Sequence, residues 1–339
     1  MNNIKLPCYY YPTTVVIIDD NKVFLENLPA NLDNKIIYKL FENTVDALQF
    51  LETKNNNSPM QKDFLEISDD SSIDNSLFVN IYKIHQRVYD ERRFETPAII
   101  IVDYDMPGVS GIEFCKALEA YPIKKIILTG VADHKVATKA FNDEVIHRFI
   151  LKDDPNVFAM INQAIGDLQS EYFSHLSELI SANIATVSIS SCLHNAMFHD
   201  FFLKLVQENH VIEFYLTDSF GSFLLFDDKK ELTRLVVQSM EEIESYYQAA
   251  KDHEASQEII RALSDREKLL CLFSEEDYRQ SVEKWPAYLY PAHKIPSIDN
   301  SYYTLIRGEN AYKNIGISKN KILSYNDYLI SCNTVLARA

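Results

Sequence analysis

A run of β-branched residues that ends abruptly at a carboxylate constrains the fold of this chain more than any other feature. It lies in residues 98–111, AIIIVDYDMPGVSG. Residues 99–102 form a short, continuous apolar run, which predicts a strand buried on both faces. Asp103 ends the run, and Pro107 and Gly108 then indicate a loop. In open α/β sheets, ligands bind at this carboxyl end of a strand. Taken alone, the pattern fits an ordinary polar loop equally well.

Apolar strands alternate with amphipathic helices around this stretch. We predict further strands at residues 14–18, 35–41, 125–128 and 147–151, and helices at 22–28, 44–51, 112–118 and 135–141. This order predicts a parallel sheet with helices on both faces. Residues 54–95 break the pattern with turn-forming and acidic segments, so we interpret them as an insertion, in which 77–89 has the pattern of one helix.

The carboxyl ends of these strands carry the residues with the most distinctive chemistry. If the strands lie in register, one edge of the sheet presents Asp19, Asp20, Asp103, Thr129 and Lys152. Neighbouring carboxylates repel one another, and a bound cation relieves the repulsion. An all-oxygen acidic site suits Mg²⁺. One carboxylate could then attack a phosphoryl group, whose oxygens the hydroxyl and the ammonium would contact. A lone threonine or lysine here would have an ordinary structural role, but five such residues at one edge favour phosphoryl chemistry.

Residues 13–170 resemble the receiver domain of bacterial two-component response regulators. The motifs that carry the resemblance are IIDDN, VDYDMPGVSG, ILTG and FILK, at the ends of the first, third, fourth and fifth predicted strands. The resemblance implies a doubly wound (βα)5 receiver domain over residues 13–155. It also implies that Asp103 is the phosphoacceptor and that a sensor histidine kinase or a small phosphodonor supplies the phosphoryl group.

The resemblance further implies a Mg²⁺ site. Asp20 and Asp103 would bind the ion directly, Asp19 would act through a water molecule, and Asp105 would contribute its backbone carbonyl. An acidic residue at position 105 is less common in the family and affects the expected rate of dephosphorylation.

Three other residues receive roles from the resemblance. Thr129 would hold one phosphoryl oxygen and Lys152 would pair with another, while Phe149 would be the switch aromatic that rotates inward when Thr129 moves. The family usually has proline directly after the lysine, whereas residues 153–154 precede Pro155 here. No catalytic group is missing, which argues against an inactive receiver.

A long helix is predicted over residues 156–183, which we interpret as a linker. Its apolar residues recur at alternating steps of three and four, a heptad-like pattern. The first turns would pack on the receiver sheet. Leu168, Tyr172, Leu176 and Leu179 would then pair with a second subunit in a homodimer. His175 lies on the same helix, and a role for it in phosphotransfer is a weaker alternative.

Residues 184–339 are predicted to form an α+β output domain with a mainly antiparallel sheet. Expected strands lie at 186–190, 212–217, 222–226, 232–238, 269–273, 287–291 and 302–307, and expected helices at 192–208, 241–251, 257–268 and 319–330. The region has no helix-turn-helix signature, no GGDEF or EAL motif, no P-loop and no HExxH. The whole chain loosely resembles the quorum-sensing response regulators of Legionella, which join a receiver to an unorthodox output domain.

Composition narrows the function of the output domain. The formal net charge is −16 and there is no basic run, which argues against nucleic-acid binding because neutralisation of phosphates supplies most of that affinity. A module for protein interaction or dimerisation is therefore favoured. Binding of a small molecule or nucleotide, or an unrecognised enzymatic activity, is the alternative, and a DNA-binding transcription factor is the least favoured function. We expect no enzymatic activity beyond gain and loss of the receiver's own phosphoryl group.

The cysteines and the termini indicate a cytoplasmic, soluble protein. The five cysteines are widely spread and none forms a CxxC motif, which is typical of reduced thiols. We expect no signal peptide and no membrane helix, because no uncharged apolar run approaches the required length.

Overall fold

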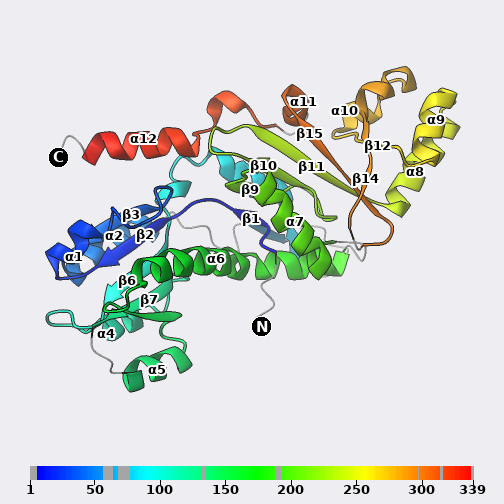
Figure 1. Ribbon diagram of the computed structural model, residues 1–339. Coiled ribbons are helices and arrows are strands. Elements are labelled where there is room, and N and C mark those ends of the chain that lie inside the picture. Colours follow the sequence, from blue (N-terminus) through cyan, green and yellow to red (C-terminus); the bar gives the residue numbers. More distant parts are fainter. Residues whose placement is uncertain are drawn as a thin grey trace. The chain divides into compact units, whose positions relative to one another are not determined.

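The computed structural model describes residues 6–55, 64–67, 77–130, 134–187, 192–296, 298–313 and 316–336 (Figure 1). The chain divides into two compact units. The receiver unit comprises Tyr11–Met60, Asp90–Leu176 and the chain from Tyr328 onward. The second unit comprises the chain up to Tyr10, together with Gln61–Tyr89 and Ser177–Asp327. Both units are therefore built from segments that are distant in the sequence.

The receiver unit is organised around a parallel five-stranded sheet of order β3-β2-β6-β7-β8. Apolar runs become its central strands, and every residue of β2 and β6 is buried. This is the doubly wound α/β fold expected from the sequence. The strands are β2 (Thr14–Ile18), β3 (Ile37–Phe41), β6 (Pro97–Asp103), β7 (Lys124–Thr129) and β8 (Arg148–Leu151). The helices that begin in this unit are α1 (Lys22–Asn27), α2 (Thr44–Asn55), α4 (Gly111–Ala117), α5 (His134–Asn142) and α6 (Val157–Val187).

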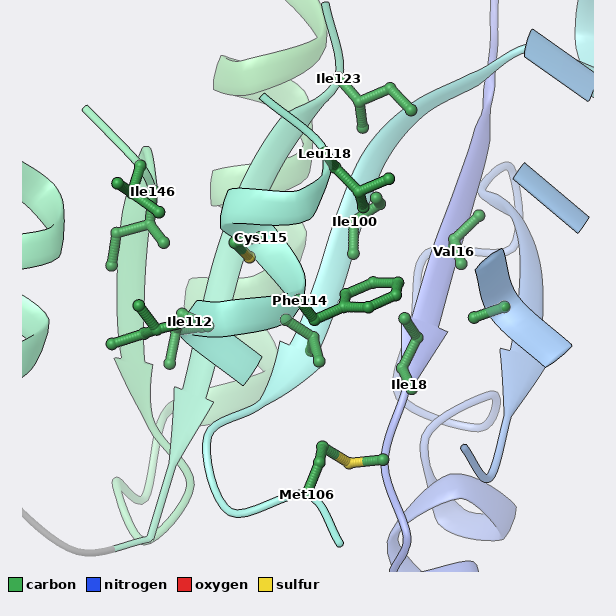
Figure 2. Packing of buried hydrophobic residues seen from close by; sticks show 14 of the residues in the cluster. Val16, Ile18, Ile100, Met106, Ile112, Phe114, Cys115, Leu118, Ile123 and Ile146 are labelled. Carbon is green, nitrogen blue, oxygen red and sulfur yellow. The ribbon is translucent and has the colours of Figure 1, made fainter. Parts of the chain in front are cut away.

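One hydrophobic core covers a face of this sheet. Alternate strand residues such as Val16, Ile18 and Ile100 pack against helix residues that include Phe114 and Cys115 of α4 (Figure 2). Successive strand residues point to opposite faces, so this alternation separates the residues of the two faces. Met106 extends the core to the loop after β6, and so ties the end of the sheet where the polar residues gather to the apolar interior.

Helix α6 carries all four residues expected at a dimer interface, and most of them are buried within the chain itself. Leu168, Tyr172 and Leu176 are at most 3 % exposed within the single chain, whereas Leu179 is 47 % exposed. Gln169 Nε2 also donates a hydrogen bond to Thr13 Oγ1 at 2.8 Å. Three of the four residues are thus core residues in this conformation and are not available to a second subunit. The heptad-like spacing arises because a helix packed within its own chain needs the same apolar stripe.

The second unit contains an antiparallel six-stranded sheet of order β1-β9-β10-β11-β15-β14. This confirms the α+β class with a mainly antiparallel sheet. Its strands are β1 (Tyr9–Tyr10), β9 (Glu213–Leu216), β10 (Phe223–Phe226), β11 (Leu232–Ser239), β14 (His293–Lys294) and β15 (Ser301–Arg307), and a separate pair is formed by β12 (Lys268–Leu270) and β13 (Leu289–Pro291). Its main helices are α7 (Ala196–Glu208), α8 (Met240–Asp252) and α9 (Gln257–Ser264), with short helices α10 (Glu275–Tyr278) and α11 (Glu309–Tyr312).

The segment expected to be an insertion, 54–95, is divided between the units. Its strands β4 (Leu65–Ile67) and β5 (Leu77–Val79) pair with each other, and α3 (Ile81–Gln86) lies against β9 of the second unit. The N-terminal strand β1 pairs with β9 as well. The second unit thus includes segments that precede residue 184, the expected start of the output domain, because their apolar residues are buried against its sheet.

Several element boundaries differ from those expected. Residues 77–89 form a strand, a helix that begins after the N-cap Asn80, and a 3-10 turn rather than one helix. Helix α6 continues to Val187, so residues 186–187 are helical, and 188–190 lie outside the described residues. Within 319–330, a 3-10 turn at Lys319–Lys321 precedes α12 (Tyr325–Leu336). Among the helices that the structure describes, none has the length and apolarity that crossing a membrane requires.

Candidate functional site

The expected polar residues meet at one edge of the receiver sheet. Ile18 pairs with Val102, so the next residues, Asp19 and Asp103, lie side by side at the ends of adjacent strands. Asp20 is the next residue along the chain, and the carboxylates of Asp19, Asp20 and Asp103 offer oxygens that lie within 4.8 Å of one another. Asp19 and Asp103 are buried and Asp20 is exposed. The parallel register therefore creates an acidic cluster from residues more than eighty positions apart.

Lys152 supplies the cation of this cluster. Its Nζ lies 2.6 Å from Asp103 Oδ1 and 2.7 Å from Asp19 Oδ2. Thr129 pairs with Leu151, and the Lys152 backbone N–H donates to the Thr129 carbonyl at 2.8 Å. Lys152 Nζ also lies 5.0 Å from the centre of the Phe24 ring, a cation–π distance. The helical spacing of Phe24 in the sequence indicates only a core residue and gives no signal for this contact.

One lysine does not neutralise the cluster. Burial raises the pKa of Asp19, and hydrogen bonds from Lys152 and from the Asn21 backbone oppose that rise only in part. Burial acts to lower the pKa of Lys152, but the hydrogen bonds to Asp103 and Asp19 outweigh it, so this pKa lies above its ordinary value. Three carboxylates and one ammonium carry a formal charge of −3 + 1 = −2.

This donor set fits a divalent, oxygen-preferring cation. Mg²⁺ is a hard ion that binds through one or two carboxylates and retains several water molecules. Asp19, Asp20 and Asp103 would hold it, and the exposed Asp20 leaves room for waters. The direct ligands and the contribution of the Asp105 carbonyl stay predictions; Asp105 itself is exposed, in the loop after Asp103.

The backbone around Asp103 is tightly constrained. The Tyr104 N–H donates to the Leu128 carbonyl at 2.8 Å, and the Gly111 N–H donates to the Tyr104 carbonyl at 3.0 Å. A Cβ on Gly111 would lie 2.2 Å from the Asp103 carbonyl oxygen, so only glycine fits. A capping box of Ser110 and Glu113 then starts α4. The presence of glycine at the last position of the VDYDMPGVSG motif is thus explained by steric restriction.

Thr129 and Phe149 are the two residues predicted to act as a switch. Thr129 is buried at the end of β7. Phe149 lies on β8, where it pairs with Ile127, and its half-buried ring packs against the receiver core. Their participation in a switch stays a prediction.

The unusual residues after Lys152 form an ordered turn. Asp154 Oδ1 accepts a hydrogen bond from the Asn156 N–H at 2.8 Å, and the Asp154 carbonyl accepts one from the Val157 N–H at 3.0 Å. Asp154 thereby leads the chain into α6 while Lys152 keeps its position between the carboxylates. The departure from the family pattern does not displace the lysine.

Comparisons with known proteins identify the chain's relatives. The chain is 34% identical to the Legionella pneumophila response regulator LqsR, with a TM-score of 0.80 over 96% of this chain and 95% of that chain. An adenylate cyclase structure from Rhodopirellula baltica matches 50% of this chain and 97% of its own, with 20% identity and a TM-score of 0.35. A CheY-like receiver domain from Methanospirillum hungatei matches 48% of this chain and 96% of its own, with 15% identity and a TM-score of 0.31.

No family model and no curated protein matches the chain. The two half-length matches are too distant to indicate a function. The similarity to LqsR differs in kind, because it extends over nearly the whole of both chains and includes both units. This chain is a response regulator with a receiver domain, and it belongs to the same family as LqsR of Legionella pneumophila.

Proposed function

We propose that the chain is a phosphorylation switch in which a sensor histidine kinase or a small phosphodonor transfers a phosphoryl group to Asp103. The observation that carries the proposal is the position of Lys152 Nζ, 2.6 Å from Asp103 Oδ1 and 2.7 Å from Asp19 Oδ2, at the carboxyl edge of the sheet. An ammonium held between two buried carboxylates can move its hydrogen bonds to a phosphoryl oxygen without a change in backbone.

Transfer begins with attack by a carboxylate oxygen of Asp103 on phosphorus. A P–O bond to Asp103 forms as the bond from phosphorus to the donor's imidazole nitrogen or acyl oxygen breaks, and the donor leaves with that electron pair. A bound Mg²⁺ would neutralise the charge of the phosphoryl oxygens. The phosphoryl group carries about −1.5 to −2 charge units next to Lys152 and Thr129. Because Asp103 loses its own negative charge in the new bond, the net change at the site is roughly −0.5 to −1.

The new phosphoryl group would act on the switch residues. The Thr129 hydroxyl would donate to one of its oxygens, and Phe149 would move further into the core that it already contacts. This would bias dimerisation or contact of the second unit with a protein partner. Leu179 is the exposed member of the expected dimer residues. We propose a cytoplasmic protein that functions in quorum sensing, without enzymatic activity beyond turnover of its own phosphoryl group. The likeness to LqsR supports a role in signalling.

Phosphorylation of the full chain with acetyl phosphate and Mg²⁺ tests the proposal. Asp103→Asn should abolish the phosphorylated product seen by intact-mass spectrometry, because an amide is a poor nucleophile toward phosphorus. Asp143→Asn is the control, since this carboxylate is exposed and lies outside the acidic cluster, and it should still be phosphorylated. An unchanged yield with Asp103→Asn, in protein with normal circular dichroism, would show that Asp103 is not the acceptor.

Light scattering with Mg²⁺ and beryllofluoride tests the dimer. A molar mass that rises with this phosphoryl mimic supports phosphorylation-dependent dimerisation. An unchanged mass in protein that binds the mimic would place the response within one existing assembly.

A further inference from the structure

The second unit contains a small polar cavity that the receiver chemistry does not use. Its volume is about 70 Å³, and its walls come from β11, from the start of α8 and from residues 271–273 after β12. The polar side chains that line it include Arg234, Gln238, Glu242 and Tyr246. All of these residues belong to the second unit.

Three polar atoms in these walls have no hydrogen-bond partner. They are Arg234 Nε, Gln238 Oε1 and Glu242 Oε2, and all three are buried. Arg234 is 8% exposed and Gln238 is 3% exposed. Buried polar groups are normally paired, so the residues that line the cavity carry one unused donor and two unused acceptors.

Neighbouring contacts hold two of these side chains in position. Gln238 Nε2 donates to the Leu270 carbonyl at 2.8 Å, which leaves the Gln238 amide oxygen unused. The Arg234 guanidinium lies 3.5 Å from the centre of the Phe273 ring and donates through Nη1 to the Lys313 carbonyl at 3.4 Å. The unpaired atoms therefore belong to side chains that are already fixed, as in a preformed site.

Glu242 lacks the hydrogen bond that a glutamate often makes near the start of a helix. It is the third residue of α8, and its N–H donates to the N-cap Ser239 at 3.2 Å. A glutamate at this position often returns the bond to the N-cap N–H, but Oε2 of Glu242 has no partner. Burial, with the nearby charge of Asp218, raises the pKa of Glu242 to about 7. An ammonium group placed directly against Glu242 Oε2 would favour the charged form of this carboxylate.

The charges in the cavity are of opposite sign and separate. Arg234 provides the cation, and burial lowers its pKa to about 10. Glu242 and Asp218 provide carboxylates, although Asp218 Oδ1 already accepts bonds from three backbone N–H groups that include those of Gly221 and Ser222. Burial raises the pKa of the Cys271 thiol far above its ordinary value, which favours the neutral thiol. The arrangement therefore suits reversible binding of a molecule that carries both charges.

We propose that this cavity binds a small zwitterion of the size of glycine to serine. Its carboxylate would accept from Arg234, and its ammonium would donate to Glu242 and Gln238. A water molecule needs roughly 10–15 Å³ by the same measure, so about five waters would occupy the same volume. The site is distinct from Asp103, and its ligand would make the second unit a sensor in its own right.

Titration of the full-length protein with alanine, ethylamine and acetate tests the proposal. Trp285 is the single tryptophan, and its buried side chain belongs to the same hydrophobic cluster as Tyr246 and Leu272, which line the cavity, so its fluorescence reports on occupancy. Alanine should bind saturably, and ethylamine and acetate, which each carry one charged group, should bind at least tenfold more weakly. Failure of alanine to bind would overturn the proposal and leave a cavity filled by water. Acetate or ethylamine that binds as tightly as alanine would overturn it too.

Substitutions locate the site. Glu242→Gln should weaken alanine binding at least tenfold, and the exposed neighbour in Glu241→Gln should leave it unchanged. Equal affinity of both variants would place binding elsewhere. Calorimetry of the unmodified protein in two buffers of different ionisation enthalpy provides a test that needs no variant. Release of protons on alanine binding at pH 7 is expected as Glu242 ionises, and absence of release would exclude the assigned contact.

Discussion

The acidic edge of the receiver and the cavity of the second unit both bring charged side chains out of water, but they arrange them differently. At the edge, Lys152 lies within 2.7 Å of two carboxylate oxygens. In the cavity, Arg234 Nε and Glu242 Oε2 have no partner. In the acidic cluster of the receiver, the lysine is fully paired and negative charge remains in excess. In the cavity, the arginine and the glutamate are not paired with each other.

This difference indicates what each site can accept. An excess of carboxylates around one ammonium favours a further cation and allows the ammonium to exchange partners. Separated charges favour a molecule that connects them. Substitution of the two cations should therefore have unequal effects, and four predictions test this comparison from the largest effect to the smallest.

Replacement of Lys152 should have the largest effect. Lys152→Met should lower the free energy of unfolding of the receiver unit by about 3 kcal/mol in EDTA, because it leaves the buried carboxylates of Asp19 and Asp103 without their partner. Mg²⁺ should recover part of the loss. Thermal unfolding followed by calorimetry measures both effects, with the exposed Lys116→Met as control. Equal stability of both variants without Mg²⁺ would contradict the pairing.

Gly111→Ala tests the backbone that positions Asp103. The new Cβ would lie 2.2 Å from the Asp103 carbonyl oxygen and 3.2 Å from Ile127 Cδ1, so the strand end or α4 must shift. We expect a loss of about 2–3 kcal/mol in unfolding free energy and slower phosphorylation by acetyl phosphate. Gly166→Ala, where nothing lies within 4 Å, is the control and should raise helix stability by about 0.5–1 kcal/mol. A change in unfolding free energy of the same sign for both substitutions would contradict the steric argument.

His147 should make the receiver less stable in acid. Burial, with the charges of Lys124 and Lys125, lowers its pKa to about 3 from an ordinary value of 6.5. Above pH 6.5 both folded and unfolded states are neutral; as pH falls below 6.5, only the unfolded state gains the proton, so stability falls until about pH 3. Between pH 7 and 5 the loss should be about 2 kcal/mol.

Urea unfolding at several pH values measures this dependence. His147→Gln should flatten it, whereas the exposed His293→Gln should not. His85 in the second unit acts with the same sign, because burial lowers its pKa to about 4. An unchanged slope in His147→Gln would exclude His147 as the titrating group.

Arg234→Met should have the smallest effect on stability. Methionine fills a similar volume without a buried unpaired donor, so the unfolding free energy should change by no more than about 1 kcal/mol. Trp285 fluorescence during urea unfolding measures the change in this unit. A loss as large as that of Lys152→Met would show that Arg234 is as well paired as the receiver lysine.

The sequence alone determined the receiver fold and its acidic edge. Apolar runs such as residues 99–102 are followed at once by Asp103, and parallel strands bring their carboxyl ends to one edge regardless of the distance between them in the chain. The positions of Asp19, Asp103 and Lys152 therefore follow from local patterns and one topological rule.

Only the tertiary structure decided the composition of the second unit and the use of α6. Strand β1 joins that unit by pairing with β9, and helix α3 joins it by packing against β9. Strand β9 lies far from both along the chain. The apolar stripe through Leu168 has one spacing whether a helix packs within its own chain or on another subunit, and the structure buries it in its own chain. No sequence motif predicts the cavity at Arg234, because its walls come from a strand, a helix and a loop that meet only in the folded unit. Local periodicity specifies which face of an element is apolar, but the partner of that face depends on contacts between distant residues.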